Sequence, residues 1–477
     1  MSRDEIPIGI SLSGGGFRAT LFALGVLYYF VDSGLAKSLR SVVSVSGGSI
    51  ANALIAQECD LSVVTSEEFE AIVRRVARTI ATTGLLWTFP AFLWMLGIVT
   101  VCIGTVTGLV LLPTTLLRLC ALVMGIVAFG GTFHLRGFAL SRAMKQVFFS
   151  TRGSPTRLKD LARVRVRHAV VATEMTSGRP IFFESHVAHG PGLRHYYCDS
   201  GSIPVHAAVR WSCTVPGLLP PGTLLSKNLW IQDAINSQEP QPPSTFILMD
   251  GGVCNNLGTD YFREATAASF GTRRDPIYVA PTVKQWLVVD ASGGLGTASE
   301  RFAKVPFVGE IVNFYRSISI LYENTIRPRT ELGTPVISIK RLPTHQIQWG
   351  ASGNASLEQR KRYVQLTEYF EEHFKTHHDE ESLYGKLPSI TSQVPTTFGR
   401  IDEEKIACLL WHGYMSALCV CYTLLGFAPP KSLCARTIYH FRRVVSATPN
   451  DIEDPWARVH HRCDLSRNIE WVGDHDA

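Results

Sequence analysis

Apolar and polar positions along the first 60 residues predict two successive strand–turn–helix units. The apolar run Ile6–Leu12 is followed by a serine- and glycine-rich turn and then by the helix-like Ala19–Val31. The strand-like Leu39–Val43, a second Ser/Gly turn and the helix-like Ile50–Gln57 repeat this order. Strands joined to helices by tight turns are typical of an α/β domain with a largely parallel sheet. Each turn therefore stands where such sheets hold their functional groups.

The second turn, Ser44-Val45-Ser46-Gly47-Gly48, has the layout of a nucleophile elbow. On such a turn the serine hydroxyl projects above the sheet edge, and the N-terminus of the next helix points at the reaction centre. Ser46 is therefore the candidate nucleophile. The usual pattern is G-x-S-x-G, in which Gly48 supplies the last glycine here and Ser44 replaces the first. An ordinary Ser/Gly turn is the alternative for this segment taken alone.

The first turn contains three consecutive glycines, Gly14, Gly15 and Gly16, with Arg18 close behind. Unobstructed amides at a helix N-terminus can donate to the oxyanion that forms when an acyl carbonyl is attacked. Arg18 adds a cation suited to a phosphate or carboxylate. A tight turn without a ligand and a dinucleotide-binding loop, with Ala19 at its third glycine position, are the alternatives. The nearest acidic residue comes too early for the ribose contact of a dinucleotide site.

A third segment, Ile247–Gly258, consists of an apolar strand that ends in Asp250. Gly251 and Gly252 let the chain turn beside the carboxylate, which suits a ligand site outside the carboxyl ends of strands. Near a serine hydroxyl, Asp250 can act as a base only if burial raises its pKa more than nearby N–H donors lower it. An Asx-type turn after a strand is the alternative.

In this order, the three segments resemble the patatin-like phospholipase family, which joins a glycine-rich oxyanion loop, a G-x-S-x-G serine and a D-G-G aspartate. Two further segments, Ala172–Gly178 and Ala208–Pro221, are similar to blocks of the same family. The resemblance runs from about Ile6 to Gly258, with a weaker strand at Leu287–Asp290. It implies a three-layer α/β domain with a central, mostly parallel sheet, interrupted here by one large insertion.

The resemblance also implies a Ser–Asp dyad, in which Ser46 attacks an ester carbonyl and Asp250 takes its proton. The amides of Gly14–Gly16 would stabilise the oxyanion, and Arg18 would assist at a substrate phosphate. The chain departs from the family at Ser44 and Ala19, where glycine is usual. It also departs where smaller apolar residues are usual, which implies a differently lined acyl pocket; these residues are Trp211, Cys213 and Thr214.

A conventional Ser-His-Asp triad stays open as an alternative, because several histidines lie between the two motifs, namely His168, His186, His189, His195 and His206.

The 11 cysteines are odd in number and scattered, and no C-x-x-C occurs among them. They therefore predict neither a disulfide framework nor a metal site. We expect no cofactor and no metal.

The longest uncharged stretch lies between the two halves of the resemblance. No Asp, Glu, Lys or Arg occurs from Thr79 to Leu117, and a second uncharged run, Leu119–Leu135, follows the single Arg118. Because about 20 apolar residues span a bilayer, we expect a hydrophobic helical hairpin with spans near Ala91–Leu112 and Leu119–Leu135. A buried helical pair and an in-plane amphipathic cap are the alternatives.

Composition and charge agree with a membrane hairpin. The 46% hydrophobic content and the mean hydropathy of +0.11 exceed what a soluble enzyme of this size needs. Basic residues flank the hairpin on both sides, and by the positive-inside rule both of its ends and the catalytic halves face the cytoplasm; these residues are Arg74, Arg75 and Arg78 before it and Arg136, Arg142 and Lys145 after it. Towards the C-terminus, we expect a polar connector at His378–Arg400 and a buried helix at Ile406–Phe427, with a third membrane span as the alternative for the latter.

The sequence thus predicts four parts: a first part of the catalytic domain (1–78), a membrane hairpin (79–141), a second part (142–427) and a C-terminal tail (428–477). The net charge of +6 suits an anionic lipid surface but is too diffuse for nucleic acid. We expect a membrane-associated serine lipid acyl hydrolase of the phospholipase A type, with membrane lipids and the bilayer as partners. A lysophospholipase or neutral-lipid esterase, and a non-catalytic lipid-binding membrane effector or scaffold, are the alternatives.

Overall fold

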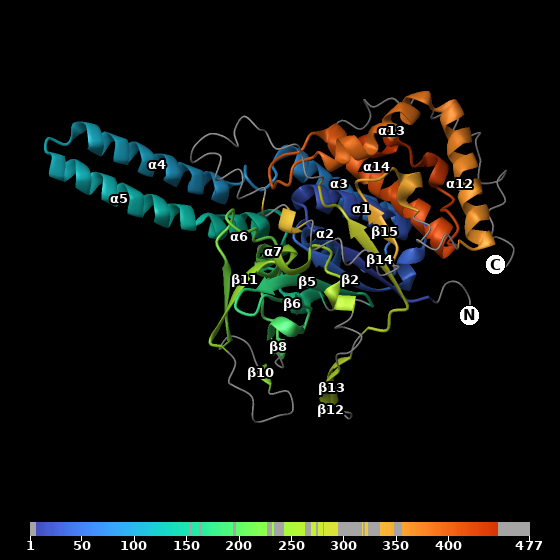
Figure 1. Cartoon of the computed structure of the whole chain (residues 1–477), viewed down its shortest axis with the longest axis horizontal. Coiled ribbons are helices and arrows are strands. Elements are labelled where there is room, and N and C mark those ends of the chain that lie inside the picture. Colours follow the sequence, from blue (N-terminus) through green and yellow to red (C-terminus); the bar gives the residue numbers. More distant parts are fainter. Residues whose placement is uncertain are drawn as a thin grey trace.

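The computed structural model describes residues 6–151, 154–161, 165–193, 197–226, 231–232, 243–262, 269–272, 275–279, 281–293, 317, 320–322, 334–347 and 355–446. A central sheet with flanking helices forms the body of the molecule, and two long helices project from it (Figure 1).

Five parallel strands form the centre of the sheet, in the order β5-β2-β1-β14-β15. The strands are β1 (Ile8–Leu12), β2 (Leu39–Val45), β5 (Arg167–Glu174), β14 (Gln285–Asp290) and β15 (Val336–Ser338). Their apolar runs are buried almost throughout, as in sheets that are covered on both faces. Beyond β5 the sheet continues antiparallel with β6 (Arg179–Phe183), β7 (Val187–His189), β8 (Tyr197–Asp199) and β10 (Ile231–Gln232). The predicted α/β class with a mostly parallel sheet is confirmed.

Strand β11 (Thr245–Asp250) meets the end of β2 along one edge of β5. Val45 of β2 pairs with Val171, and Asp250 of β11 pairs with the next residue, Ala172. The opposite edge of β5 is occupied by β6 over these residues. The parallel β2 and the antiparallel β11 therefore approach each other end to end. β11 pairs on its other side with β9 (Gly222–Leu225).

The core centres on two long helices, α1 (Gly16–Asp32) and α14 (Glu403–Val420), which pack against each other. A Cβ on Gly25 would overlap the Leu410 carbonyl, and a Cβ on Gly413 would overlap the Phe22 carbonyl, so the glycines permit a close approach of the two backbones. The uncharged run Ile406–Phe427, predicted as a buried helix, forms most of α14 and the helical turn Cys421–Leu425 that continues it, and most of its residues are buried.

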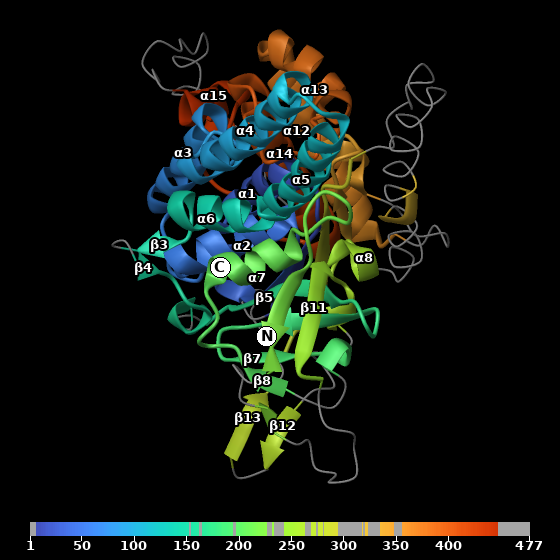
Figure 2. The ribbon, with the colours of Figure 1, turned by 90° about the vertical axis from the view of Figure 1, so that its left-hand side faces the viewer.

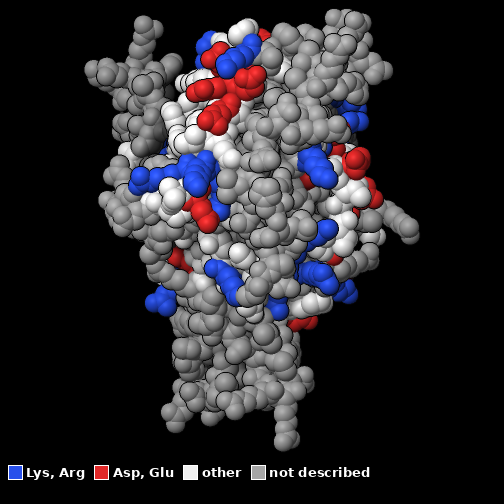
Figure 3. Space-filling model, turned by 90° about the vertical axis from the view of Figure 1, so that its right-hand side faces the viewer, with Lys and Arg blue, Asp and Glu red and all other residues white. Residues whose placement is uncertain are grey.

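Helices α4 (Phe89–Leu111) and α5 (Thr115–His134) form the projecting hairpin, which lies within the predicted insertion (Figures 1 and 2). Among the described residues, three helical stretches are long and apolar enough to cross a membrane. In the stretch that contains α4, 0% of the most apolar part is buried, and in the stretch that contains α5 the share is 6%. In the stretch that contains α14 it is 89%. Arg118 is the one Asp, Glu, Lys or Arg from 89 to 134. By contrast, the face of the molecule away from the hairpin mixes both charge signs (Figure 3).

The expectation of a polar connector at His378–Arg400 is wrong for most of its length. Residues His378–Ser392 form helix α13, whose first turn carries Asp379, Glu380 and Glu381. Acidic side chains at a helix N-terminus interact favourably with the helix dipole. α13 is followed by an irregular segment with several bends and then by α14.

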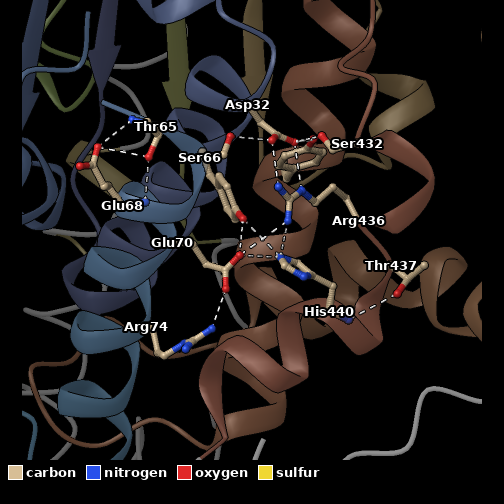
Figure 4. A network of polar contacts seen from close by, with 12 residues as sticks. Asp32, Thr65, Ser66, Glu68, Glu70, Arg74, Ser432, Arg436, Thr437 and His440 are labelled. Atoms are coloured by element: carbon tan, nitrogen blue, oxygen red, sulfur yellow. Dashed lines mark hydrogen bonds and ion pairs between the residues drawn. The ribbon is translucent and has the colours of Figure 1, made fainter. Parts of the chain in front are cut away.

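Part of the predicted C-terminal tail packs against the core (Figure 4). Arg436, which precedes α15 (Ile438–Val445), donates to both carboxylate oxygens of Asp32 at 3.0 and 2.9 Å. Burial favours a raised pKa for Asp32, but the hydrogen bonds and charge of Arg436, helped by the Ser432 and Tyr414 hydroxyls, outweigh it and hold this pKa at about 2. Residues 447–477 lie outside the described part.

Candidate active site

Ser46 occupies the turn between β2 and α2 (Gly47–Glu58) in a strained backbone conformation. With φ 49° and ψ −122°, it is the one non-glycine residue with positive φ among the described residues. Outliers of this kind persist only where the surrounding structure holds them, and they cluster at functional sites. The serine is 4% exposed. This geometry is that of a nucleophile elbow.

The glycines that follow Ser46 let the elbow pack directly on the glycine-rich loop. A Cβ on Gly47 would overlap the backbone of Gly16, and a Cβ on Gly48 would come within 2.7 Å of carbonyl oxygens at the end of β1. The Thr20 hydroxyl of α1 donates to the Gly47 carbonyl at 2.7 Å and so joins the two turns. Neither glycine position has room for a side chain.

Ser44, at the first position of the elbow motif, belongs to a buried polar network beneath the turn. Its hydroxyl donates to the Ala169 carbonyl at 3.1 Å and accepts from the Asn52 amide at 2.9 Å. The Asn52 carbonyl lies 2.6 Å from Nδ1 of His168, whose pKa is lowered by burial to about 4. Ser44 therefore connects β2 to β5 and α2.

Asp250 ends β11 beside the elbow and is 1% exposed. Its Oδ1 accepts a hydrogen bond from the Gly252 amide at 2.7 Å. Oδ2 makes no hydrogen bond to a described residue, and the Ser46 hydroxyl lies near enough to lower the pKa of the carboxyl. Burial raises the pKa of Asp250 to about 7, because the Gly252 amide and the Ser46 hydroxyl lower it by less. Near pH 7 this carboxylate can both accept and return a proton.

The three glycines of the first turn have different partners. The Gly14 amide donates to the Asn256 carbonyl at 3.2 Å, and a Cβ on Gly14 would lie 3.0 Å from Cβ of Ser46. Gly15 and Gly16 have φ values of 145° and 60°, which favour glycine. No described acceptor engages their amides. The geometry thus favours Gly15 and Gly16 over Gly14 as oxyanion donors; the predicted role of all three stays a prediction.

Arg18 points into the protein rather than towards a ligand. Its guanidinium donates to the Ala291 carbonyl at 3.0 Å, the Val394 carbonyl at 2.5 Å and the Thr396 hydroxyl at 3.2 Å. Burial lowers its pKa to about 10, against the opposing effect of Asp290. These contacts favour a structural role, and the predicted contact with a substrate phosphate finds no support in this geometry.

Ser212 lies within the segment Ala208–Pro221 and contacts the elbow, although the sequence alone predicts no role for it. It ends α7 (Val205–Ser212), and its hydroxyl accepts from the Ser46 amide at 2.9 Å and lies 2.9 Å from the Ser49 hydroxyl. Two residues on, the Thr214 carbonyl accepts from the Asp250 amide at 3.0 Å. The end of α7 therefore contacts both members of the predicted dyad.

Thr214 departs from the family pattern, and two further residues that do so, Trp211 and Cys213, also lie at this end of α7. Trp211 packs against the Phe183 ring at 5.5 Å and leaves no space for a side chain on Gly222. Cys213 is buried beside Ser46, and burial raises the pKa of its thiol, an effect that the Asp250 charge increases. Their predicted part in lining an acyl pocket stays a prediction.

None of the described candidate histidines hydrogen-bonds to Ser46. His168 binds Asn52, and His189 lies 2.9 Å from a Glu184 carboxylate oxygen. The pKa of His206 is lowered to about 4 by burial and by Lys145. His195 lies outside the described residues. The arrangement gives no support to a Ser-His-Asp triad.

Comparison with protein families agrees with this geometry. The model of the family described as patatin-like phospholipase matches residues 10–263, more than half of the 477 residues. The matched region holds the glycine-rich loop, the elbow and the D-G-G segment. The chain belongs to the patatin-like phospholipase family. This membership supports a lipid acyl hydrolase. No curated relative matches the sequence.

Three solved structures are similar to this patatin-like chain at 13% identity. Human GIVD cytosolic phospholipase A2 has a TM-score of 0.31, with 66% of this chain and 46% of that chain covered. The same enzyme in complex with methyl gamma-linolenyl fluorophosphonate has a TM-score of 0.37, with 93% and 60% covered. VipD from Legionella pneumophila has a TM-score of 0.26, with 94% of both chains covered. The chain thus spans about half of the phospholipase A2 chains, and at these TM-scores the similarities add nothing to the family assignment.

Proposed function

We propose that this protein is a membrane-associated lipid acyl hydrolase of the phospholipase A type, with Ser46 as nucleophile and Asp250 as base. One observation carries the proposal: the strained serine at the end of β2 meets a buried aspartate, with its pKa raised to about 7, at the end of β11. A buried carboxylate with one backbone donor and a serine hydroxyl nearby is suited to proton transfer near neutral pH.

In the proposed reaction, Asp250 accepts the hydroxyl proton as the Ser46 oxygen attacks the ester carbonyl. The carbonyl oxygen takes up negative charge beside the amides of Gly15 and Gly16, and donors fixed at that place lower the barrier. The protonated Asp250 then gives its proton to the departing alcohol, which leaves an acyl-serine. Water attacks this ester, Asp250 takes the water proton, and the fatty acid is released as Ser46 regains its hydroxyl proton.

The hairpin supports attachment of the enzyme to a bilayer. At 1.5 Å per residue, the 23-residue α4 is about 35 Å long and the 20-residue α5 about 30 Å, enough to cross the hydrocarbon core of a bilayer. Arginine side chains lie over aromatic rings at its base, an arrangement typical of residues in the headgroup region of a bilayer. The pairs are Arg136 with Phe133, Arg142 with Phe138 and Arg400 with Trp87, with the guanidinium carbon 3.8, 5.0 and 5.0 Å from the ring centroid. We propose that the hairpin spans the bilayer and that the catalytic domain faces the cytoplasm.

The hydrolase proposal is tested by labelling the purified protein with a fluorophosphonate probe and measuring the intact mass. We expect one adduct on the wild type, none on Ser46→Ala and strongly slowed labelling on Asp250→Asn. Ser62→Ala, which removes a hydroxyl that binds Asp60 in the turn after α2, serves as the control and keeps the adduct. Absence of an adduct on the wild type would refute the proposal and favour a lipid-binding effector.

The substrate class is tested with a panel of esters after the dyad is established. Arg18 donates to acceptors within the protein and therefore does not by itself identify a substrate that carries phosphate. The panel for this reason compares a diacyl phospholipid with a lysophospholipid and a triacylglycerol at equal surface concentration. The proposal expects the highest kcat/KM for the diacyl phospholipid. A higher value for either other lipid would replace the phospholipase A assignment and leave the dyad intact.

The membrane proposal is tested with the exposed thiols of Cys102 on α4 and Cys120 on α5. In reconstituted vesicles, a membrane-impermeant maleimide is expected to leave both unmodified until the vesicles are dissolved in sodium dodecyl sulfate. Cysteines placed by Thr114→Cys at the hairpin turn and Arg142→Cys beyond its base should react from opposite sides of the bilayer. Reaction of both from the same side would contradict a spanning hairpin.

A further inference from the structure

An irregular segment with several bends, residues 394–400, lies between the oxyanion loop and the start of the hairpin; we call it the strap. It follows α13 and precedes α14 in the chain. Its contacts on one side reach the turn that holds Gly16, and its contacts on the other side reach the residues just before α4. The sequence predicts only a polar connector here, and nothing in the proposed reaction uses it.

On one side the strap fixes the position of the oxyanion loop. The Phe17 amide donates to the Thr397 carbonyl at 3.0 Å, and a Cβ on Gly16 would lie 2.7 Å from the same oxygen. The Phe17 and Phe398 rings pack edge to face with centroids 5.7 Å apart. Arg18 adds hydrogen bonds to the Val394 carbonyl and to Thr396. The glycine proposed as an oxyanion donor therefore lies against the strap backbone.

On the other side the strap is bound to the start of the hairpin. The Leu85 amide donates to the Phe398 carbonyl at 2.8 Å. A Cβ on Gly84, which has φ 56°, would lie 2.8 Å from the carbonyl carbon of Gly399. The Arg400 guanidinium stacks on the exposed Trp87 ring at the base of α4. Adjacent strap residues thus bind the oxyanion loop through Thr397 and the hairpin through Phe398.

The C-terminal end of the hairpin, where α5 ends at the base, is bound to the loop that follows α7. Arg136, the first residue of α6 (Arg136–Val147), donates from Nε to the Leu218 carbonyl at 2.7 Å. Leu218 lies shortly after Ser212 and Thr214, which contact the two members of the dyad. Both ends of the hairpin therefore contact segments that shape the active site.

We propose that the strap is a positioning element that couples the seating of the hairpin in a bilayer to the placement of the oxyanion loop. The inference rests on the proposed function. A bilayer holds the base of α4 and its Trp87–Arg400 pair at a fixed depth, which detergent does not do to the same extent. Since a displacement of about 1 Å in a catalytic group can cost up to 100-fold in rate, a small shift passed along the strap changes the reactivity of Ser46.

The test compares the labelling rate of a water-soluble fluorophosphonate probe in detergent and in vesicles of ether-linked phosphatidylcholine with ether-linked phosphatidylglycerol, which carry no acyl ester that could compete with the probe for Ser46. We expect bilayers to raise the wild-type rate about tenfold, within the range that positional effects produce. Gly84→Ala, which forces the strap away from the hairpin, should keep the detergent rate and lose the bilayer stimulation. Gly178→Ala is the matched control, because Gly178 also has positive φ (68°) but no atom within 4 Å of its added Cβ.

A second variant, Arg400→Gln, keeps the test decisive if Gly84→Ala does not fold. It removes the cation from the Trp87 ring without a backbone change and should lower the stimulation at least twofold. Equal stimulation in wild type, Gly84→Ala and Arg400→Gln overturns the inference. A wild-type rate that is the same in detergent and bilayers also overturns it but leaves the hydrolase standing, whereas failure of Ser46 to react at all overturns both.

Discussion

The amide of Ser46 donates to the hydroxyl of Ser212 at 2.9 Å, across 166 residues of sequence. This bond satisfies a buried backbone donor at the one non-glycine position with positive φ among the described residues. The Ser212 oxygen also lies 2.9 Å from the Ser49 hydroxyl in the first turn of α2. One hydroxyl at the end of α7 thus holds the elbow in the conformation that its own sequence disfavours.

We predict that Ser212→Ala lowers kcat about 10- to 100-fold, because the elbow relaxes and the nucleophile is misplaced. The free energy of unfolding should fall by about 1 to 3 kcal/mol, the cost of an unsatisfied buried donor. Steady-state kinetics and denaturant unfolding measure the two effects. Ser200→Ala is the matched control, since it removes a buried hydroxyl that donates to the Glu184 carbonyl. A similar kcat in both variants would contradict the role of Ser212.

The pKa of Asp250, raised to about 7, predicts the pH dependence of the reaction. Only the ionised carboxylate can accept the Ser46 proton, so kcat/KM should rise about tenfold per pH unit below this pKa and level off above it. Rates with a neutral ester measured from about pH 5 to about pH 9 test this profile. An apparent pKa near 4, that of an ordinary aspartate, would exclude Asp250 in this environment as the base.

The same shift predicts that the protein loses stability as the pH rises. Because the folded-state pKa of Asp250 lies above its ordinary value of 3.8, the stabilising contribution of the protonated form is full below about pH 4 and disappears towards about pH 7. The loss amounts to about 4 kcal/mol at most. Asp250→Asn should remove this slope from denaturant unfolding measured across the window, and an unchanged slope would assign it to other groups.

A substitution of Arg18 distinguishes a structural role of this residue from a role in substrate binding. We predict that Arg18→Lys lowers kcat/KM by the same factor for a phospholipid and a neutral ester, because lysine cannot reproduce the three hydrogen bonds to Ala291, Val394 and Thr396. Kinetics with matched acyl chains in the two substrates give the ratio. A loss confined to the phospholipid would instead support the phosphate contact expected from the sequence.

The ion pair between Arg436 and Asp32 is predicted to hold the C-terminal helix on the core. Arg436→Met should lower the free energy of unfolding by about 3 to 5 kcal/mol, because it leaves the buried Asp32 carboxylate without its cation. Arg442→Met, which breaks a more exposed pair with Glu404, should cost less than about 1 kcal/mol. Equal losses in denaturant unfolding would contradict the difference in burial.

Much of the fold could be predicted because its signals are local. The Ser/Gly turns after β1 and β2 follow from residues within a few positions of each other, and the hairpin follows from an uncharged run. The expected strand and helix ends differ from the observed ones by a few residues, as for α2, which begins at Gly47 instead of Ile50. Domain limits and the roles of the site residues stay predictions.

The partners of the site residues could not be predicted, since they come from distant segments. The Arg18 acceptors lie more than 270 positions away, and the Gly14 amide bonds to Asn256 beyond the D-G-G turn. Polarity also misled at α13, where acidic residues that read as a connector instead begin a helix. Such contacts depend on tertiary packing, which overrides local preference.

The edge of β5 that receives both Val45 and Asp250 has a consequence for how this chain tolerates change. Because β2 and β11 are each aligned on adjacent residues of one strand, the distance between the proposed nucleophile and the proposed base is set by β5 and not by the length of chain between them. The register of these two strands on β5 therefore does not depend on the length of the hairpin. A single residue inserted within β5, between Val171 and Ala172, would in contrast move the two strand ends apart and separate Ser46 from Asp250.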